Sequence, residues 1–261
     1  MLVDIHAHLD HEYYKDKLDQ VISRAKKAGV THIITSGVNT ESNKINLEIS
    51  KKYDIVKFSP GMYPIDLLGK QTHETGLSRQ YTKINITEEF KFIKKNIKDI
   101  ISIGEVGLDF KIDTTQHKQQ INNFQEIINF VEKIKKPIII HSRKAEKEVI
   151  DILETSKIKK INLHCFGGKK NLVKKAADLG YTFSIPCIIN KLQHFQMIVD
   201  MVNLSQLLTE TDAPWLSPIP EEMNEPQNIK QTIPIIAKIK RLDPEEVKKN
   251  IFMNFQKMFL K

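Results

Sequence analysis

The sequence predicts an α/β chain folded as a single (β/α)₈ barrel of the TIM type, one domain over residues 1–261. Two observations lead to this fold. Eight short runs rich in Ile and Val recur along the chain, and longer amphipathic stretches rich in Lys and Glu separate them. Continuous apolar runs are typical of parallel strands that helices cover. Eight strand–helix units fit a barrel of this length, with a doubly wound open sheet as the alternative, because periodicity does not reveal closure.

The expected strands are the apolar runs themselves. They span residues 2–9, 31–37, 55–63, 100–108, 137–142, 161–166, 181–186 and 206–211. The clearest helices carry apolar residues at helical spacing and stop at a glycine or before a proline. We expect them at residues 16–28, 116–135, 169–179 and 244–260.

One connection is much longer than the others. Residues 63–87 are polar and only weakly periodic. Connections of this length are uncommon in compact domains unless they have a function or lack order. We therefore expect this segment to be an enlarged loop that could act as a lid.

Composition excludes several classes of protein. No apolar stretch approaches the roughly 20 residues of a membrane span, and the first residues do not follow the pattern of a signal peptide. The two cysteines cannot form a disulfide framework, which indicates a reducing, cytoplasmic location. The net charge of +8 permits a nucleic-acid partner but is explained equally well by a solvated lysine-rich surface. Nothing in the sequence implies an obligate protein partner.

Histidines and acids lie at the carboxyl ends of five expected strands, where the active sites of barrels form. A lone histidine at a strand end is more often structural, but agreement among five strands by chance is improbable. Imidazole and carboxylate together suit Zn²⁺, Mn²⁺ and Mg²⁺. Six ligands exceed the need of one catalytic ion and fit two bridged ions. These candidate ligands are His6, His8, Glu105, His141, His164 and Asp212.

Five motifs at these positions resemble the TatD family of metal-dependent hydrolases, within the amidohydrolase superfamily. The resemblance runs almost from end to end of the chain. The motifs are Asp4-Ile-His6-Ala-His8, Gly104-Glu-Val-Gly-Leu-Asp109, Lys136-Pro-Ile-Ile-Ile-His141-Ser-Arg143, His164-Cys-Phe-Gly167 and Thr209-Glu-Thr-Asp212-Ala-Pro214.

The resemblance implies a pair of divalent metal ions, with Mg²⁺, Mn²⁺ and Zn²⁺ all open. By the family pattern His6, His8 and Asp212 hold one ion, His141 and His164 hold the other, and Glu105 bridges them. Members of the family are best known as magnesium-dependent deoxyribonucleases that remove nucleotides from single-stranded DNA. The same scaffold resembles D-aminoacyl-tRNA deacylases, so a deacylase or another amide or ester hydrolase is the alternative.

The ligand set predicts how a bond would be hydrolysed. Two cations would lower the pKa of a shared water from 15.7 toward about 7 and give a hydroxide nucleophile. Asp212 is the candidate proton shuttle, and Glu105 supplies the bridging carboxylate. Arg143 follows His141 on the same strand face and would clamp a phosphate, with a structural salt bridge as the equal alternative.

Other residues near the motifs have expected supporting roles. Glu210 would orient a histidine ligand or simply be a paired acid, and Asp109 would likewise support a ligand. The glycines that flank Glu105 would let the backbone approach the site. Cys165 is expected to pack rather than to act as a nucleophile. Trp215 would either stack on a nucleobase or pack at the rim. The remaining histidines are expected on the surface or in loops: His11, His32, His73, His117 and His194.

Two positions depart from the family pattern. Tyr63, in Gly61-Met-Tyr63-Pro64, replaces a common histidine, and Met223 replaces an arginine before Asn224-Glu-Pro226. Phosphate binding depends on Arg and Lys, so the lost cation and the acids of Pro220-Glu-Glu222 favour a shifted substrate. Three hypotheses therefore remain: a TatD-like deoxyribonuclease, another hydrolase on the same metal site, or a non-catalytic nucleic-acid-binding protein.

Overall fold

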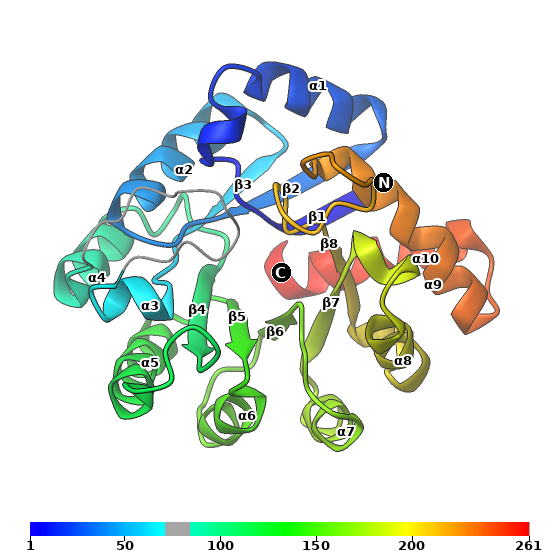
Figure 1. Cartoon of the computed structure of the whole chain (residues 1–261). Helices are drawn as coiled ribbons and strands as arrows, with labels where there is room; N and C mark the ends of the chain where they lie inside the picture. The colour runs from blue at the N-terminus through cyan, green and yellow to red at the C-terminus, as the bar shows by residue number, and fades with distance from the viewer. Residues whose placement is uncertain (71–83, 261) are drawn as a thin grey trace.

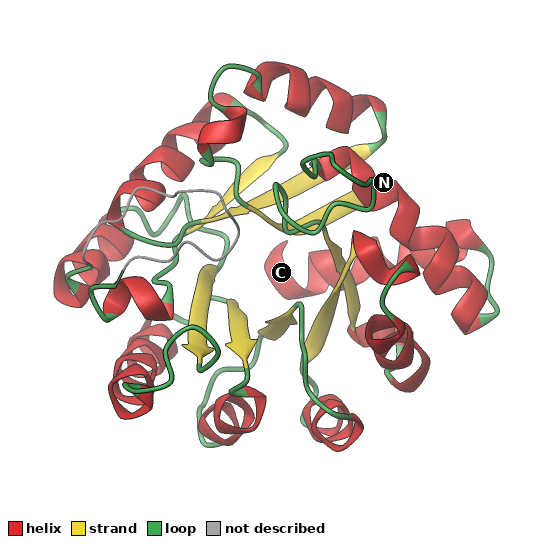
Figure 2. Ribbon diagram, in the orientation of Figure 1, coloured by secondary structure: helices red, strands yellow, loops and turns green. Residues whose placement is uncertain are grey.

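The computed structural model describes residues 1–70 and 84–260. The described residues form eight strands, and the strands that pair are parallel. The strands stand around a central axis with helices outside them (Figure 1), as the colouring by secondary structure also shows (Figure 2). The predicted TIM-type barrel is confirmed. The strands are β1 Leu2–Ala7, β2 Val30–Ser36, β3 Val56–Ser59, β4 Ile103–Asp109, β5 Ile138–Arg143, β6 Ile161–His164, β7 Thr182–Pro186 and β8 Leu207–Glu210.

The strands form two hydrogen-bonded sheets that meet at two seams. One sheet has the order β1-β2-β3 and the other β4-β5-β6-β7-β8. At the first seam isolated parallel bridges join Phe58 to Ile100 and Met62 to Val106. At the second seam Ala7 pairs with Ala213, just beyond β8. Because the first and last strands lie side by side, the open doubly wound sheet is excluded.

A buried carboxylate reinforces the seam between β1 and β8. Asp4 is fully buried on β1. Its Oδ1 accepts the backbone N–H groups of Thr211 at 2.9 Å and His6 at 3.3 Å, and its Oδ2 accepts the Thr211 hydroxyl at 2.5 Å. Since unpaired buried donors cost free energy, Asp4 stabilises the position of the two chain segments that carry His6 and Asp212.

The helices bury one apolar face against the strands. In α1, for example, Val21, Ile22 and Ala25 are buried, and α5 ends at Ile134, followed by its cap residue Lys135, two residues before Pro137. The helices are α1 Leu18–Lys27, α2 Thr40–Lys52, α3 Pro64–Leu67, α4 Ile86–Lys95, α5 His117–Ile134, α6 Glu146–Glu154, α7 Lys170–Asp178, α8 Gln193–Met201, α9 Thr232–Lys240 and α10 Pro244–Phe255.

The final helix predicted at residues 244–260 is divided in the structure. Asp243 caps α10 through bonds to the N–H groups of Glu245 and Glu246, and the chain continues from Gln256 to Leu260 as one π-helical turn. Phe255 and Phe259 are buried in the core. None of the described helices is long and apolar enough to cross a lipid bilayer.

The long connection between β3 and β4 is only partly described. Its first residues form α3, which begins directly after Tyr63, and α4 begins at Ile86 after the cap residue Asn85. The lid predicted for residues 63–87 concerns mainly residues 71–83, which lie outside the described residues.

The burial of Asp4 generates a prediction about stability. Replacing Asp4 with Ala leaves the Thr211 N–H, the Thr211 hydroxyl and the His6 N–H without this acceptor inside the protein. We expect the free energy of unfolding to fall by about 3 kcal/mol or more, measured by urea denaturation.

The matched control is Asp178→Ala, which removes an exposed acid paired with Lys174 on α7. We expect it to cost less than about 0.5 kcal/mol. Equal stability losses in the two variants would contradict the role of Asp4 at the seam.

Candidate metal centre

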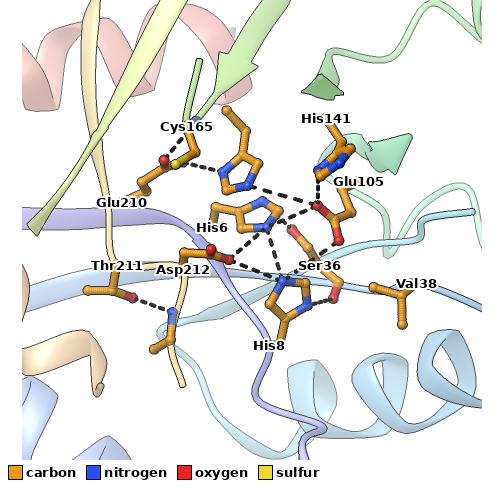
Figure 3. A network of polar contacts seen from close by, with 12 residues as sticks. His6, His8, Ser36, Val38, Glu105, His141, Cys165, Glu210, Thr211 and Asp212 are labelled. Atoms are coloured by element: carbon orange, nitrogen blue, oxygen red, sulfur yellow. Dashed lines mark hydrogen bonds and ion pairs between the residues drawn. The ribbon is translucent and has the colours of Figure 1, made fainter. Parts of the chain in front are cut away.

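Six side chains from five strands or their ends converge at the mouth of the barrel. They are the predicted ligands His6, His8, Glu105, His141, His164 and Asp212, and Figure 3 shows five of the six labelled, pointing toward one another. Glu105 was expected at the end of its strand, and this is wrong: β4 continues to Asp109, so Glu105 lies inside it. The carboxylate still reaches the mouth.

Glu105 is the centre of this arrangement. Its Oε2 lies 3.7 Å from His6 Nε2, 3.4 Å from His141 Nδ1 and 3.9 Å from His164 Nε2. Its Oε1 lies 3.9 Å from His8 Nε2. One carboxylate therefore contacts the ring nitrogens of all four histidines.

Asp212 lies on the side of His6 and His8. Its Oδ1 is 3.6 Å from His6 Nε2 and 3.4 Å from His8 Nε2. Asp212 adopts a left-handed backbone conformation with φ of 54°, and its N–H donates to the carbonyl of His6 at 2.9 Å. The turn after β8 thus brings Asp212 to β1, which explains why the residue sits two positions beyond its strand.

Each histidine is oriented by a partner on the ring nitrogen that faces away from the centre. His8 Nδ1 donates to the carbonyl of Ser36 at 3.1 Å, and His6 Nδ1 lies 3.1 Å from the Ser36 hydroxyl. His164 Nδ1 bonds Glu210 at 2.7 Å. Such partners fix the tautomer and leave the other nitrogen for a cation. The contact expected between Glu210 and a candidate histidine ligand is present.

His141 is held by a chain of two groups. Its Nε2 donates to Asp109 Oδ2 at 3.1 Å, and the Tyr63 hydroxyl donates to the same oxygen at 2.8 Å. Asp109 Oδ1 in turn accepts the N–H groups of Lys111 and Ile112. Asp109 is therefore fixed from both sides, and it turns His141 Nδ1 toward Glu105.

Burial and neighbouring charges set the protonation of the centre. Burial raises the pKa of Glu105, but His141, His8 and His6 outweigh it and lower that pKa well below its usual value. Burial and the adjacent imidazoles lower the pKa of His6. Glu105 is therefore ionised and His6 neutral, which are the forms that ligate a cation.

The donor set fits a cation. In the neutral form of His8 its Nε2 carries no proton, yet it lies 3.2 Å from His6 Nε2. Two donors about 2.1 Å from one cation lie about 3 to 3.5 Å apart at tetrahedral or octahedral angles. In the described part of the chain three groups each bring their ligand atoms within 4.8 Å of one another, a little wider than this spacing: His6, His8 and Glu105; Glu105, His141 and His164; and His6, His164 and Asp212.

The backbone of β4 approaches β5 closely where the ligands lie. A Cβ at Gly107 would come within 1.9 Å of the His141 carbonyl oxygen, and one at Gly104 would lie 2.7 Å from Ile139. The close approach predicted for the two glycines beside Glu105 is confirmed, because a larger residue would push His141 away.

Three further residues of the sequence analysis lie around the centre. Arg143 ends β5 two residues after His141. Cys165 packs against the core, and burial raises the pKa of its thiol, so the predicted non-nucleophilic role is supported. Trp215 lies edge-on to His8, with ring centroids 4.9 Å apart and planes at 76°.

The expectation that the remaining histidines are surface or loop residues is wrong for His32 and incomplete for His11, which lies in a loop but is buried. His117 and His194 are half-buried in α5 and α8. His11 is buried and caps the short 3₁₀ helix Glu12–Tyr14, with its ring 5.4 Å from that of Trp215. His32 lies on β2 against Phe255. Both were missed because a pattern of metal ligands does not reveal which other histidines are packed. His73 lies outside the described residues.

Two residues that follow Met223 fasten the segment after β8 to the barrel. Asn224 is fully buried and donates to the carbonyls of Thr211 and Leu216. Glu225 pairs with the Arg24 guanidinium of α1 at 2.6 and 2.8 Å. These residues fasten the loop to the barrel, and Arg24 neutralises Glu225.

Sequence comparisons identify relatives along the whole chain. The family model described as TatD related DNase matches residues 3–260. An uncharacterized metal-dependent hydrolase of Methanocaldococcus jannaschii is 35% identical over 258 residues, which cover 98% of this chain and 96% of that protein. Human deoxyribonuclease TATDN3 is 30% identical over 266 residues, which cover 100% of this chain and 95% of the human protein.

Solved structures share the fold. YJJV, a TatD homolog from Escherichia coli, superposes with a TM-score of 0.87 at 21% identity, covering 100% of this chain and 98% of that chain. A TatD family hydrolase from Entamoeba histolytica gives 0.84 at 20% identity, with coverages of 99% and 97%. At these identities the two structures bear on the fold alone.

The hydrogen bond from Tyr63 to Asp109 generates a prediction about metal affinity. Tyr63→Phe removes the hydroxyl that holds Asp109 against His141. Loss of such an outer partner lowers metal affinity by about 10- to 100-fold. We expect a loss near tenfold, measured by calorimetric titration with Mn²⁺ and Zn²⁺.

Tyr53→Phe is the matched control, since it removes a hydroxyl that donates to Asp19 on the surface. We expect unchanged metal affinity. If Tyr63→Phe also leaves the affinity unchanged, Tyr63 does not position His141.

The histidines also predict how metal binding depends on pH. Burial lowers the pKa of His141, but Asp109 and Glu105 outweigh it and raise the value to about 9 in the metal-free centre. For His164, Glu210 and Asp212 likewise outweigh burial and raise the pKa to about 10. Below these values a cation must displace protons, so affinity for Zn²⁺ should rise as pH increases from 6 toward 8.

The measurement is calorimetric titration in two buffers of different ionisation enthalpy, which counts the protons released. Proton release that falls as pH rises toward the histidine pKa values is expected. Affinity that is independent of pH, without proton release, would contradict this protonation scheme.

Proposed function

Because the chain belongs to the TatD-related DNase family, a family with curated members named as metal-dependent hydrolases and deoxyribonucleases, we propose that it hydrolyses phosphodiester bonds of DNA. The observation that carries the proposal is the buried Glu105 carboxylate that contacts four histidines at the barrel mouth.

The proposal assigns two divalent ions to this centre, with Glu105 shared between them. His6, His8 and Asp212 would hold one ion, and His141 and His164 the other. The two groups that share Glu105 support this division, since each supplies two histidine nitrogens. Divalent cations there would acidify a water and polarise a phosphoryl oxygen, which is the chemistry of metal-dependent phosphodiester hydrolysis.

The chain's own residues would position the substrate and move protons. Asp212 is the proposed proton acceptor because its side chain is 17% exposed and so remains open to the mouth, whereas the Glu105 side chain is 7% exposed. Arg143 is the proposed clamp for a non-bridging phosphate oxygen, because a guanidinium can donate two parallel hydrogen bonds. Glu210 and Asp109 would keep the imidazoles of His164 and His141 fixed during the reaction.

We propose single-stranded DNA as the substrate and a reducing, cytoplasmic compartment as the location. Free thiols at Cys165 and Cys187 support the compartment. The candidate metal centre is recessed in the barrel mouth. Single-stranded DNA can bring its phosphates there more easily than a duplex, because it is narrower.

We expect two substitutions to abolish turnover while the protein keeps its fold. Asp212→Asn keeps the size of the side chain but removes its basicity, and we expect kcat to fall about 10²- to 10⁴-fold. His6→Ala removes a nitrogen that contacts both Glu105 and Asp212, and we expect metal content to fall as well. Circular dichroism and metal analysis of both purified variants separate chemistry from folding. Wild-type rates in either variant would remove the mechanism.

The activity itself is tested with end-labelled single-stranded DNA and purified protein. Mg²⁺, Mn²⁺ and Zn²⁺ are supplied separately to chelator-treated enzyme, and Asp212→Asn serves as the control for contaminating nucleases. We expect metal-dependent shortening that the variant lacks, with the label giving the direction. No cleavage by protein that demonstrably contains metal would contradict a deoxyribonuclease.

A further inference from the structure

A cavity of about 530 Å³ opens beside the metal centre, between the segment that follows β1 and the start of α2. His8 and Trp215 form the wall nearest the centre. Its outer part lies between α1 and α2, which are neighbours on the outside of the barrel (Figure 1). Small-molecule sites are commonly cavities of about 300–1,000 Å³, so this cavity has the size of a binding site.

The charges of the cavity do not suit a phosphate. Among its described lining residues three carboxylates, those of Asp10, Glu12 and Glu41, accompany a single lysine, Lys15. Phosphate recognition in nucleic-acid sites depends on Arg and Lys. The part of a substrate that enters this cavity must therefore carry no negative charge, while its phosphate stays over the histidines.

The walls suit a flat apolar group. Leu18, Val38 and Ile45 line the cavity together with Trp215. Ile45 is 40% exposed although it is a large aliphatic residue on α2. The Trp215 ring and the exposed aliphatic carbons match the apolar faces of a flat heteroaromatic ring.

We propose that this cavity binds the nucleobase of the nucleotide adjacent to the scissile phosphodiester bond. The base is neutral, has two apolar faces, and carries acceptors within its plane. Base stacking on aromatic side chains tolerates any sequence. The cavity would therefore distinguish a nucleotide with a base from an abasic one, but would not distinguish one base from another. The position next to the scissile bond rests on the proposed deoxyribonuclease function, whereas affinity for a nucleoside does not.

Trp215 provides a direct test, because it is the only tryptophan of the chain. Deoxyadenosine is added to the wild-type protein while intrinsic fluorescence is recorded, and deoxyribose serves as the probe without a base. We expect a saturable change with deoxyadenosine and none with deoxyribose. Ile45→Glu, which places a further charge on the cavity wall, should weaken the affinity about tenfold or more.

Ile219→Glu is the matched control, since Ile219 is 37% exposed and lies outside the cavity lining. It should bind deoxyadenosine as the wild type does. No fluorescence change with deoxyadenosine, or equal affinity in the Ile45 and Ile219 variants, would overturn the proposal.

Hydrolysis distinguishes this proposal from the deoxyribonuclease function. Cleavage is compared for single-stranded DNA with a base or an abasic residue at the terminal nucleotide. We expect Ile45→Glu to raise KM for the base-bearing DNA about tenfold and to leave abasic DNA unchanged. Nucleoside binding without any DNA cleavage would contradict the deoxyribonuclease function but support the nucleoside site. Equal cleavage of base-bearing and abasic DNA would contradict the proposed base site in the cavity and leave the deoxyribonuclease function intact.

Discussion

The carboxylate of Glu105 lies buried at the barrel mouth with the imidazoles of His6, His8, His141 and His164 around it. A buried charge is tolerated only when opposite charge or a metal compensates it. Without a cation, protons on the histidines supply that compensation, which is why the pKa of His141 rises while that of Glu105 falls. Bound cations would take the place of those protons. The four histidines therefore converge on Glu105 because its buried charge must be compensated.

A second ring of residues makes this arrangement rigid. Ser36 orients His6 and His8, Glu210 orients His164, and Asp109 orients His141. Tyr63 stands where the family commonly has histidine, and its hydroxyl joins this ring by bonding Asp109. The residue at this departure from the family pattern therefore supports the candidate metal centre from outside. The carboxylate of Glu225 forms an ion pair with the Arg24 guanidinium on α1, so its negative charge is neutralised.

Much of this architecture could be predicted because it depends on patterns that the sequence displays directly. Apolar runs located the eight strands of the described residues, and the period of two placed His6, on β1, and His8, just after it, on one side of the chain. Ser36 could not be recognised, because serines are common at strand ends and this one acts partly through its carbonyl. The left-handed backbone of Asp212, the buried position of His11 and the cavity beside Trp215 depend on contacts between distant segments. No local pattern encodes such contacts.

The central claim is that Glu105 is shared by two cation positions at the barrel mouth. The most direct measurement is anomalous diffraction from crystals of the protein grown with Mn²⁺, recorded at the manganese edge. We predict two peaks about 3.5–4 Å apart, one next to His6 and His8, the other next to His141 and His164, with Glu105 between them. A single peak, or peaks away from Glu105, would contradict the account.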